Sequence, residues 1–108
     1  MLEVKPIQTK ERQKEICELC EIEFNPDCLA YGAEENGKLL GVSQFRIFGG
    51  YAVIYDLANA AGVDDLEALI IIEKAVLNFI DLCGIKEVVL NNGNRINLEG
   101  YFDSPCQK

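Results

Sequence analysis

Apolar and polar positions at the start of the chain indicate a short strand followed by an amphipathic helix. Residues 2 to 7 alternate well enough for a strand, and Pro6 places it at an edge or an end because proline has no N–H to donate. Thr9 suits a helix N-cap. Asn25-Pro26-Asp27 is expected to end this helix, since all three residues favour turns. Its apolar stripe consists of Ile16, Leu19, Cys20 and Ile22.

A β-hairpin is predicted next, between residues 29 and 47. Asn36 and Gly37 tolerate the positive φ of a type I′ turn, and apolar-rich segments flank them. Both faces of the second segment are partly apolar, which is typical of an internal strand that is covered on both sides. One predicted face carries Leu39, Gly41, Ser43, Phe45 and Ile47, and the other carries Leu40, Val42, Gln44, Arg46 and Phe48.

A third strand, a long helix and a fourth strand complete the pattern. The helix is predicted from Asp65 to about Cys83, with Gly84 as its C-terminal cap. Residues 85–90 form an apolar strand, and the helix between the two strands predicts a parallel, right-handed crossover. The tail from residue 91 to 108 is too rich in Asn and Gly to predict an element. In the third strand Tyr51, Val53, Tyr55 and Leu57 alternate with Ala52, Ile54, Asp56 and Ala58.

Length and composition add a fold class to these elements. The 108 residues close one hydrophobic core, so we expect a single domain with an α/β (α+β) fold. Apolar residues make up 49% and charged residues 26%, as in an ordinary folded protein. The longest apolar run, residues 68–72, is far shorter than the ~20 residues that span a bilayer. Residues 1–10 lack the apolar region of a signal peptide, which predicts a cytoplasmic protein.

The charge of the chain narrows the classes of partner. Ten basic and eighteen acidic residues give a formal net charge of −8, which repels nucleic-acid phosphates and anionic membrane surfaces. A cationic amine or a basic peptide would be attracted instead. The alternative is that the acidic surface serves only solubility.

Five cysteines and no histidine limit the available chemistry. Without histidine, neither His-based acid catalysis nor a Cys/His zinc site is possible, and we expect no metal. Cys17 and Cys20 share a helix face with apolar neighbours, which favours core packing, although the C-x-x-C spacing leaves a thiol-based redox role as an alternative. An odd number of cysteines predicts free thiols in a reducing compartment. The remaining three are Cys28, Cys83 and Cys106.

The order of elements and several short motifs resemble the GNAT superfamily of acetyl-CoA-dependent N-acetyltransferases. The hairpin carries most of the resemblance: AEENGKLLGVSQFRI, from Ala33 to Ile47, fits well the family pattern of apolar residue, Ala, acidic residue, any residue, Gly, Lys, two apolar residues and Gly, with Glu34 at the Ala position. Residues 84–86 and 100–102 also fit family patterns, and the similarity extends in outline over residues 2–102. It implies a mixed sheet with antiparallel N-terminal strands, a central long helix and a parallel strand pair.

The resemblance also implies a set of site residues. Asp56 is the candidate general base, with a hydrogen-bonded strand carboxylate as the alternative reading, and Tyr101 is the candidate acid, with Tyr55 as a possible substitute. Both tyrosines have core packing as their alternative. The resemblance places acetyl-CoA against Leu57, Asn59, Gly62 and Asn91.

The segment that corresponds to the family's pyrophosphate loop contains no basic residue. Asp64 and Glu67 are spaced as a capping box, in which the aspartate accepts the helix N–H groups that a phosphate would need. Asp64 and Asp65 therefore argue against tight binding of acetyl-CoA. Two functions remain open. The first is an N-acetyltransferase that acts on a small amine or a basic peptide. The second is a non-catalytic GNAT-like binding or regulatory module, for which a homodimer through a strand edge is one option.

Overall fold

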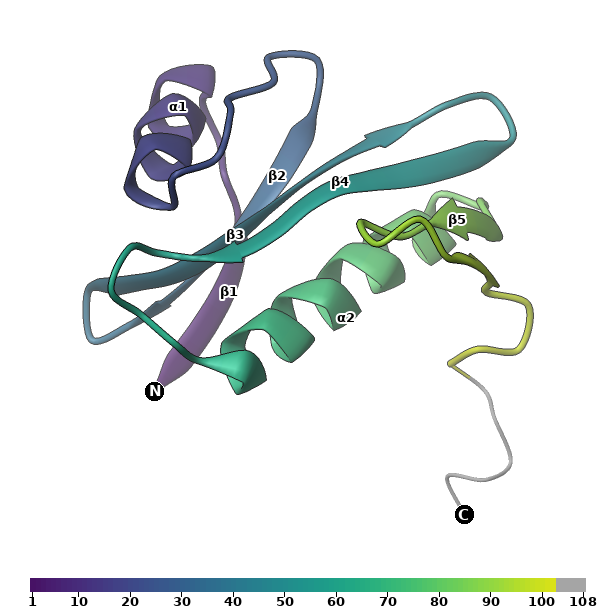
Figure 1. The fold of residues 1–108 in the computed structure, drawn as a ribbon. Helices are drawn as coiled ribbons and strands as arrows, with labels where there is room; N and C mark the ends of the chain where they lie inside the picture. Colours follow the sequence, from purple (N-terminus) through teal and green to yellow (C-terminus); the bar gives the residue numbers. More distant parts are fainter. Residues whose placement is uncertain (103–108) are drawn as a thin grey trace.

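Residues 1–102, which the computed structural model describes, form a six-stranded mixed sheet with a helix on each face (Figure 1). The strands lie in sequence order; β4 and β5 are parallel, and every other neighbouring pair is antiparallel. The predicted mixed sheet is confirmed. The strands are β1 (Leu2–Pro6), β2 (Leu29–Glu35), β3 (Lys38–Ile47), β4 (Tyr51–Asn59), β5 (Glu87–Val89) and β6 (Arg95–Asn97), and the helices are α1 (Lys10–Leu19) and α2 (Leu66–Leu82).

Helix α1 begins as predicted and ends earlier than predicted. The Thr9 hydroxyl accepts the Arg12 N–H at 3.1 Å, which confirms the N-cap. The helix ends at Leu19 because Glu21 adopts a left-handed conformation with φ 58°, which lets the Ile22 N–H reach the Cys17 carbonyl at 3.0 Å. The predicted end at residues 25–27 is therefore wrong. Leu19, expected in the apolar stripe, is 52% exposed.

The predicted β2–β3 hairpin is confirmed, but its side-chain alternation is interrupted. Asn36 and Gly37 both have positive φ, as a type I′ turn requires. Glu34 pairs with Leu39 and Ala33 pairs with Gly41, so Leu40 is an extra residue in a β-bulge. Leu40 consequently joins the core beneath α2, while Leu39 packs on the opposite side, against α1. The assignment of Leu39 and Gly41 to one face is wrong.

A second bulge lies in β4. Gln44 pairs with Asp56 and the next residue, Phe45, pairs with Ile54, which leaves Tyr55 unpaired. Ile54 therefore faces the core beneath α2, whereas Asp56 lies on the α1 side with Gln44. The predicted sharing of one face by Ile54 and Asp56 is wrong, because an extra residue reverses the alternation.

The long helix α2 and the crossover that it forms match the prediction closely. The helix ends at Leu82, and Gly84 closes its last turn as predicted. The φ of 84° at Gly84 allows the Ile85 N–H to reach the Ile80 carbonyl at 3.3 Å. Its N-cap is Asp65, whose carboxylate accepts the Ala68 N–H at 3.0 Å. The capping box predicted from Asp64 and Glu67 is therefore wrong, because the residue three positions after Asp65 is an alanine. The predicted parallel pair is confirmed. Strand β6 was not predicted.

The sheet separates two cores, so β3 is buried on both faces, as expected. Gly41 lies where β3 approaches β4 most closely, since a Cβ there would be 2.8 Å from the Ala58 carbonyl oxygen. Among residues 1–102, no helix has the length and apolar character needed to span a membrane. The larger core, beneath α2, includes Phe45, Ile54, Ile72, Val76, Leu77, Ile80, Val88 and Leu98; the smaller, beneath α1, includes Ile16, Cys20, Ala30, Val42 and Ala60.

Candidate functional site

The two parallel strands separate after a short contact and leave one edge of β4 open. Strand β4 pairs with β5 only over residues 51–53, although it continues to Asn59. Within the described residues, no strand pairs with this edge beyond Val53. A gap of this kind next to a parallel pair offers unpaired backbone groups to an extended ligand.

The direction of the β4 backbone determines which residues present polar groups to the open edge. Ala60 donates its N–H to Leu40 on β3 at 3.0 Å, and the Ala58 carbonyl oxygen lies over Gly41 of the same strand. Successive residues of a strand point their backbone groups in opposite directions. The N–H and C=O groups of Leu57 and Asn59 therefore point to the open edge, on the side where the resemblance places a cofactor.

Asp56 lies beside this edge, half-buried on the α1 side of the sheet. Its Oδ2 accepts a hydrogen bond from the Gln44 side-chain amide at 2.7 Å. Among the described residues, no donor reaches its other oxygen, Oδ1. The carboxylate is therefore held by one oxygen and can accept a proton with the other, which is the arrangement a general base needs.

The sequence did not single out Gln44, although it organises the surroundings of Asp56. Its side chain is fully buried and uses all four of its hydrogen-bonding positions. Besides Asp56, it donates to the Glu23 carbonyl at 2.9 Å and accepts from the Gln13 side chain and the Asn25 N–H, each at 2.9 Å. One side chain thus joins α1, the loop after it, β3 and β4. The available signal was a glutamine in a strand that is apolar on both faces.

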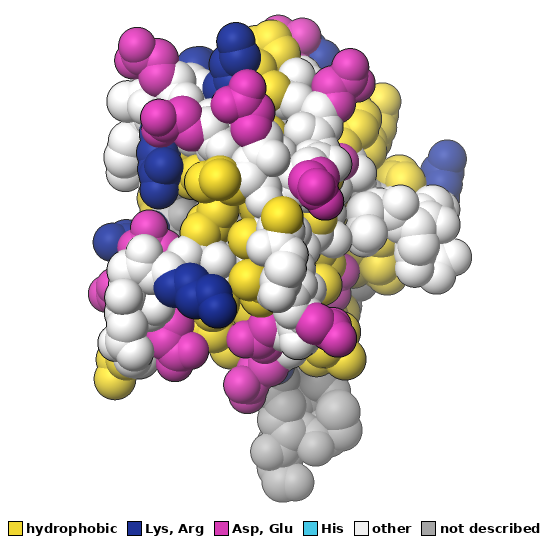
Figure 2. Space-filling model, turned by 60° about the vertical axis from the view of Figure 1, so that its left-hand side comes forward, with side chains coloured by type: hydrophobic (Ala, Val, Ile, Leu, Met, Phe, Trp, Pro, Cys, Tyr) yellow, Lys and Arg dark blue, Asp and Glu magenta, His cyan; other side chains and the backbone are white. Residues whose placement is uncertain are grey.

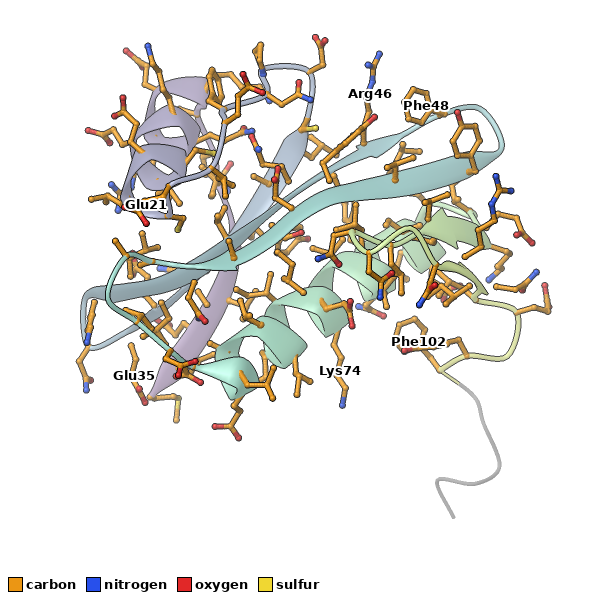
Figure 3. The ribbon with its side chains drawn as sticks, viewed as in Figure 1. Glu21, Glu35, Arg46, Phe48, Lys74 and Phe102 are labelled. Carbon is orange, nitrogen blue, oxygen red and sulfur yellow. The ribbon has the colours of Figure 1, made fainter. Side chains whose placement is uncertain are left out.

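The structure separates the two candidate tyrosines. Tyr55 stands in the β4 bulge next to Asp56 and is 42% exposed. Tyr101 lies in the turn after β6, with its N–H on the Leu98 carbonyl and its ring against Phe102. Phe102 packs against the core beneath α2, and Figure 3 shows it on the side of α2. Tyr101 is thus placed with the α2 layer, whereas Asp56 faces the α1 layer.

Two buried thiols lie close enough to Asp56 to be affected by its charge. Burial first, and the Asp56 charge second, raise the pKa of Cys17 and the pKa of Cys28 to about 11. Cys20 is also buried, and its pKa is raised to about 11, mainly by burial. Thiols with such pKa values are packing residues rather than nucleophiles. The core role expected for Cys17 and Cys20 agrees with this burial, and Cys106 lies outside the described residues.

The loop from β4 to α2 is stabilised by its own side chains. Asn59 donates its side-chain amide to the Leu40 and Asp65 carbonyls at 3.0 and 3.1 Å, and its Oδ1 accepts the Asp65 N–H at 3.3 Å. Gly62 is exposed, with φ 79°, in a turn closed by the Val63 N–H on the Ala60 carbonyl. The predicted cofactor residue Asn59 therefore has only its backbone available to a ligand.

Several N–H groups in the segment that corresponds to the family's pyrophosphate loop already have acceptors within the protein. Five of them between residues 60 and 68 do so: Ala60 on Leu40 O, Ala61 on Leu19 O, Val63 on Ala60 O, Asp65 on Asn59 Oδ1 and Ala68 on Asp65 Oδ1. A diphosphate binds at a helix N-terminus through free N–H groups and favourable charge. The five bonded N–H groups are therefore not free to hold a diphosphate.

The charges around the same helix end are also unfavourable to an anion. A groove of about 600 Å³ beside it is lined by three carboxylates, those of Glu35, Asp64 and Asp65, and by a single cation, Lys38. Figure 3 shows Glu35 next to the start of α2, and Figure 2 shows acidic side chains spread over the face that carries α1 and the β2–β3 turn. Carboxylates within a few ångströms of a diphosphate repel it.

Asn91 lies in the turn that follows β5. The turn is exposed, and in it the Leu90 N–H donates to the Asn94 carbonyl at 2.7 Å. The turn leads into β6, which pairs with β5 on the side opposite to β4. Residues 1–102 contain no group of three or more potential metal ligands.

Comparison with solved structures identifies proteins of similar fold. Comparisons of the sequence with protein-family models and with curated proteins found no match. The fold is similar to that of a protein of unknown function from meticillin-resistant Staphylococcus aureus, described as a probable acetyltransferase, with a TM-score of 0.60, 16% identity and coverage of 83% of this chain and 78% of that one.

A second similar structure contains coenzyme A. N-acetylglutamate synthase from Neisseria gonorrhoeae, solved with coenzyme A and N-acetyl-glutamate, matches with a TM-score of 0.68 and 12% identity. The match covers 95% of this chain and 27% of that enzyme, so the chain spans about a quarter of the enzyme's length. At these identities the likeness concerns the fold. The chain has a GNAT-like fold, the fold of its acetyltransferase neighbours.

Proposed function

We propose that this protein is a GNAT-like acyltransferase that moves an acetyl group from a thioester to an amine. The observation that carries the proposal is the open edge of β4, where the backbone groups of Leu57 and Asn59 lie near the Asp56 carboxylate. An extended, amide-bearing thioester fits such an edge by pairing with the strand. The acetyltransferase neighbours support the reaction class.

In the proposed reaction the chain supplies a base and an edge that positions the donor. The amine nitrogen attacks the thioester carbonyl, forming a C–N bond as the C–S bond breaks. Asp56 Oδ1 takes the proton from the amine, while Gln44 holds Oδ2 and orients the carboxylate. The sulfur leaves as a thiolate and takes a proton from water. Tyr55 is next to Asp56 along β4. The acid role of Tyr101 stays a prediction.

The acceptor in this proposal is a cationic amine or a basic peptide. The net charge of −8 concentrates cations near the surface and repels polyanions. The amine must lose its proton to react, and the carboxylate that receives the proton also attracts the ammonium form.

The test is acetyl transfer from S-acetyl thioesters to a panel of amines, with the acetylated product detected by mass spectrometry. Asp56→Asn is expected to lower kcat by about a hundredfold or more, the usual contribution of a general base. Glu18→Gln, an exposed carboxylate on α1, is the matched control and should leave kcat unchanged. Folded protein that acetylates no amine with any donor would contradict the proposal.

A second candidate function, a non-catalytic binding module, is favoured by one observation. Two N–H groups at the start of α2, those of Asp65 and Ala68, have acceptors within the protein, so this helix end is capped without a cofactor. In this case a basic peptide would bind without being acetylated, and a homodimer could form through the outer edge of β1. A dimer mass in sedimentation experiments, together with binding of a basic peptide by protein that acetylates no amine, would support this function over the first.

A further inference from the structure

The open edge of β4 and the start of α2 make different demands on a donor. The edge offers unpaired backbone groups at Leu57 and Asn59, which suit an extended chain that contains amides. The helix start presents carboxylates, and its Asp65 and Ala68 N–H groups are already bonded within the protein, so it suits a diphosphate poorly. A nucleotide-linked donor such as acetyl-CoA needs both places at once.

We infer that the acyl donor is a thioester on an amide-bearing arm of the pantetheine type that carries no nucleotide diphosphate. This inference rests on the proposed acyltransferase function and specifies its donor. The arm pairs with β4 beyond Val53, and its thioester end lies toward Asp56. The end that carries the nucleotide in CoA points to the groove lined by Glu35, Asp64 and Asp65.

Two features of the residues at the start of α2 disfavour binding of a diphosphate. The Asp65 carboxylate occupies the Ala68 N–H, and Asn59 occupies the Asp65 N–H, so a phosphate would have to displace protein acceptors. One carboxylate at about 5 Å lowers the affinity for a unit negative charge roughly a hundredfold at an effective dielectric near 20, and less where water screens it. Lys38 is the single cation lining the groove.

The inference is tested by binding rather than by turnover. S-acetylpantetheine, acetyl-CoA and ADP are titrated separately into the protein, with the thermal midpoint and the calorimetric Kd as readouts. We expect S-acetylpantetheine to bind at least as tightly as acetyl-CoA, and ADP not to shift the midpoint. Acetyl-CoA binding tenfold or more tightly than S-acetylpantetheine would overturn the inference and leave the acyltransferase proposal in place. If neither thioester binds, both fall.

Variants of the groove provide an independent measurement. Glu35→Gln combined with Asp64→Asn removes two exposed charges and leaves the Asp65 cap intact, so the fold is preserved. This double variant is expected to bind acetyl-CoA at least tenfold more tightly than the unmodified protein, with no change in the Kd of S-acetylpantetheine. Glu99→Gln, which removes an exposed carboxylate just after β6, is the control. An unchanged acetyl-CoA Kd in the double variant would count against the role assigned to the carboxylates.

Discussion

Gln44 has the largest number of structural roles of any single polar side chain near the candidate base. Its four hydrogen bonds reach Gln13, Glu23, Asn25 and Asp56, and its side chain is fully buried. Replacing a buried, fully bonded amide leaves several partners unsatisfied, each at a cost of about 1–3 kcal/mol where water cannot reach it. Gln44 is thus expected to matter for stability as well as for the orientation of Asp56.

We therefore predict that Gln44→Leu lowers the free energy of unfolding by about 3 kcal/mol in a urea titration. The side chains have similar volumes, so the loss reflects hydrogen bonds rather than a cavity. The exposed Gln8→Leu is the control and should change stability by less than about 0.5 kcal/mol. An equal loss of unfolding free energy in both variants would show that the buried hydrogen bonds of Gln44 contribute no more to stability than an exposed glutamine does.

The cysteines give a prediction with a defined pH dependence. Burial raises the pKa of Cys17, of Cys20 and of Cys28 from 9.0 to about 11. The folded state therefore holds these protons more tightly than the unfolded state, so the stabilisation is complete below pH 9 and is lost as the pH rises toward 11. Unfolding titrations at intervals between pH 8 and pH 11 are expected to show this decline.

Thiol modification at about pH 8 tests the same burial independently. In a Cys106→Ser background, the exposed Cys83 should react rapidly, and the three buried thiols only on unfolding. Further replacement of Cys83 by Ser should abolish the rapid phase. Rapid reaction of Cys17 or Cys20 would revive the redox role that their spacing left open.

At the scale of elements, the start of α2 distinguishes two adjacent aspartates. Asp65 caps the helix through the Ala68 N–H, whereas Asp64 is exposed. Asp65→Ala is expected to lower the free energy of unfolding by about 1 kcal/mol, as is usual for an N-cap, and Asp64→Ala to leave it nearly unchanged. Thermal or urea unfolding of the two variants provides the comparison. The reverse order would restore the capping box that the sequence suggested.

The elements also show what could be read from the sequence and what could not. The hairpin turn, both helix N-termini within one residue and the Gly84 cap carry local signals, because specific residue types are needed at turns and caps. The bulges at Leu40 and Tyr55 carry none, since an extra residue does not alter the alternating pattern on either side of it. The left-handed conformation of Glu21 could not be predicted from the sequence either, because that conformation is rare outside glycine and asparagine.

Some residues of the candidate site could likewise be named from the sequence, and others could not. Asp56 and the backbone of Leu57 and Asn59 could be named from the resemblance, whereas Gln44 could not, since its partners lie 12 to 31 residues away in the chain. The acidic character of the loop before α2 was evident from the sequence. That several of its N–H groups are already bonded, those of Ala61, Val63 and Asp65 among them, became apparent only from the fold.

For the molecule as a whole, the acidic surface sets the response to salt. With a net charge of −8, attraction of a cationic acceptor should weaken as ions screen it, with a Debye length of about 8 Å at 0.15 M. We predict that kcat/KM for a basic peptide falls by severalfold between low salt and about 0.15 M. The value for an uncharged amine should stay constant, and equal salt responses would argue against electrostatic selection of the acceptor.

The order of strands in the sheet also determines how the chain can fold. Every strand pairs with its neighbour in sequence, and the antiparallel meander from β2 to β4 is closed by short connections. Such pairings lose little chain entropy and form early, whereas the parallel pair must wait for α2 to close the longest connection in the described sheet. The pairing of β5 with β4, and with it the open edge beyond Val53, is therefore expected to form late in folding. Kinetic probes at β5 should report structure later than probes at the β2–β3 turn.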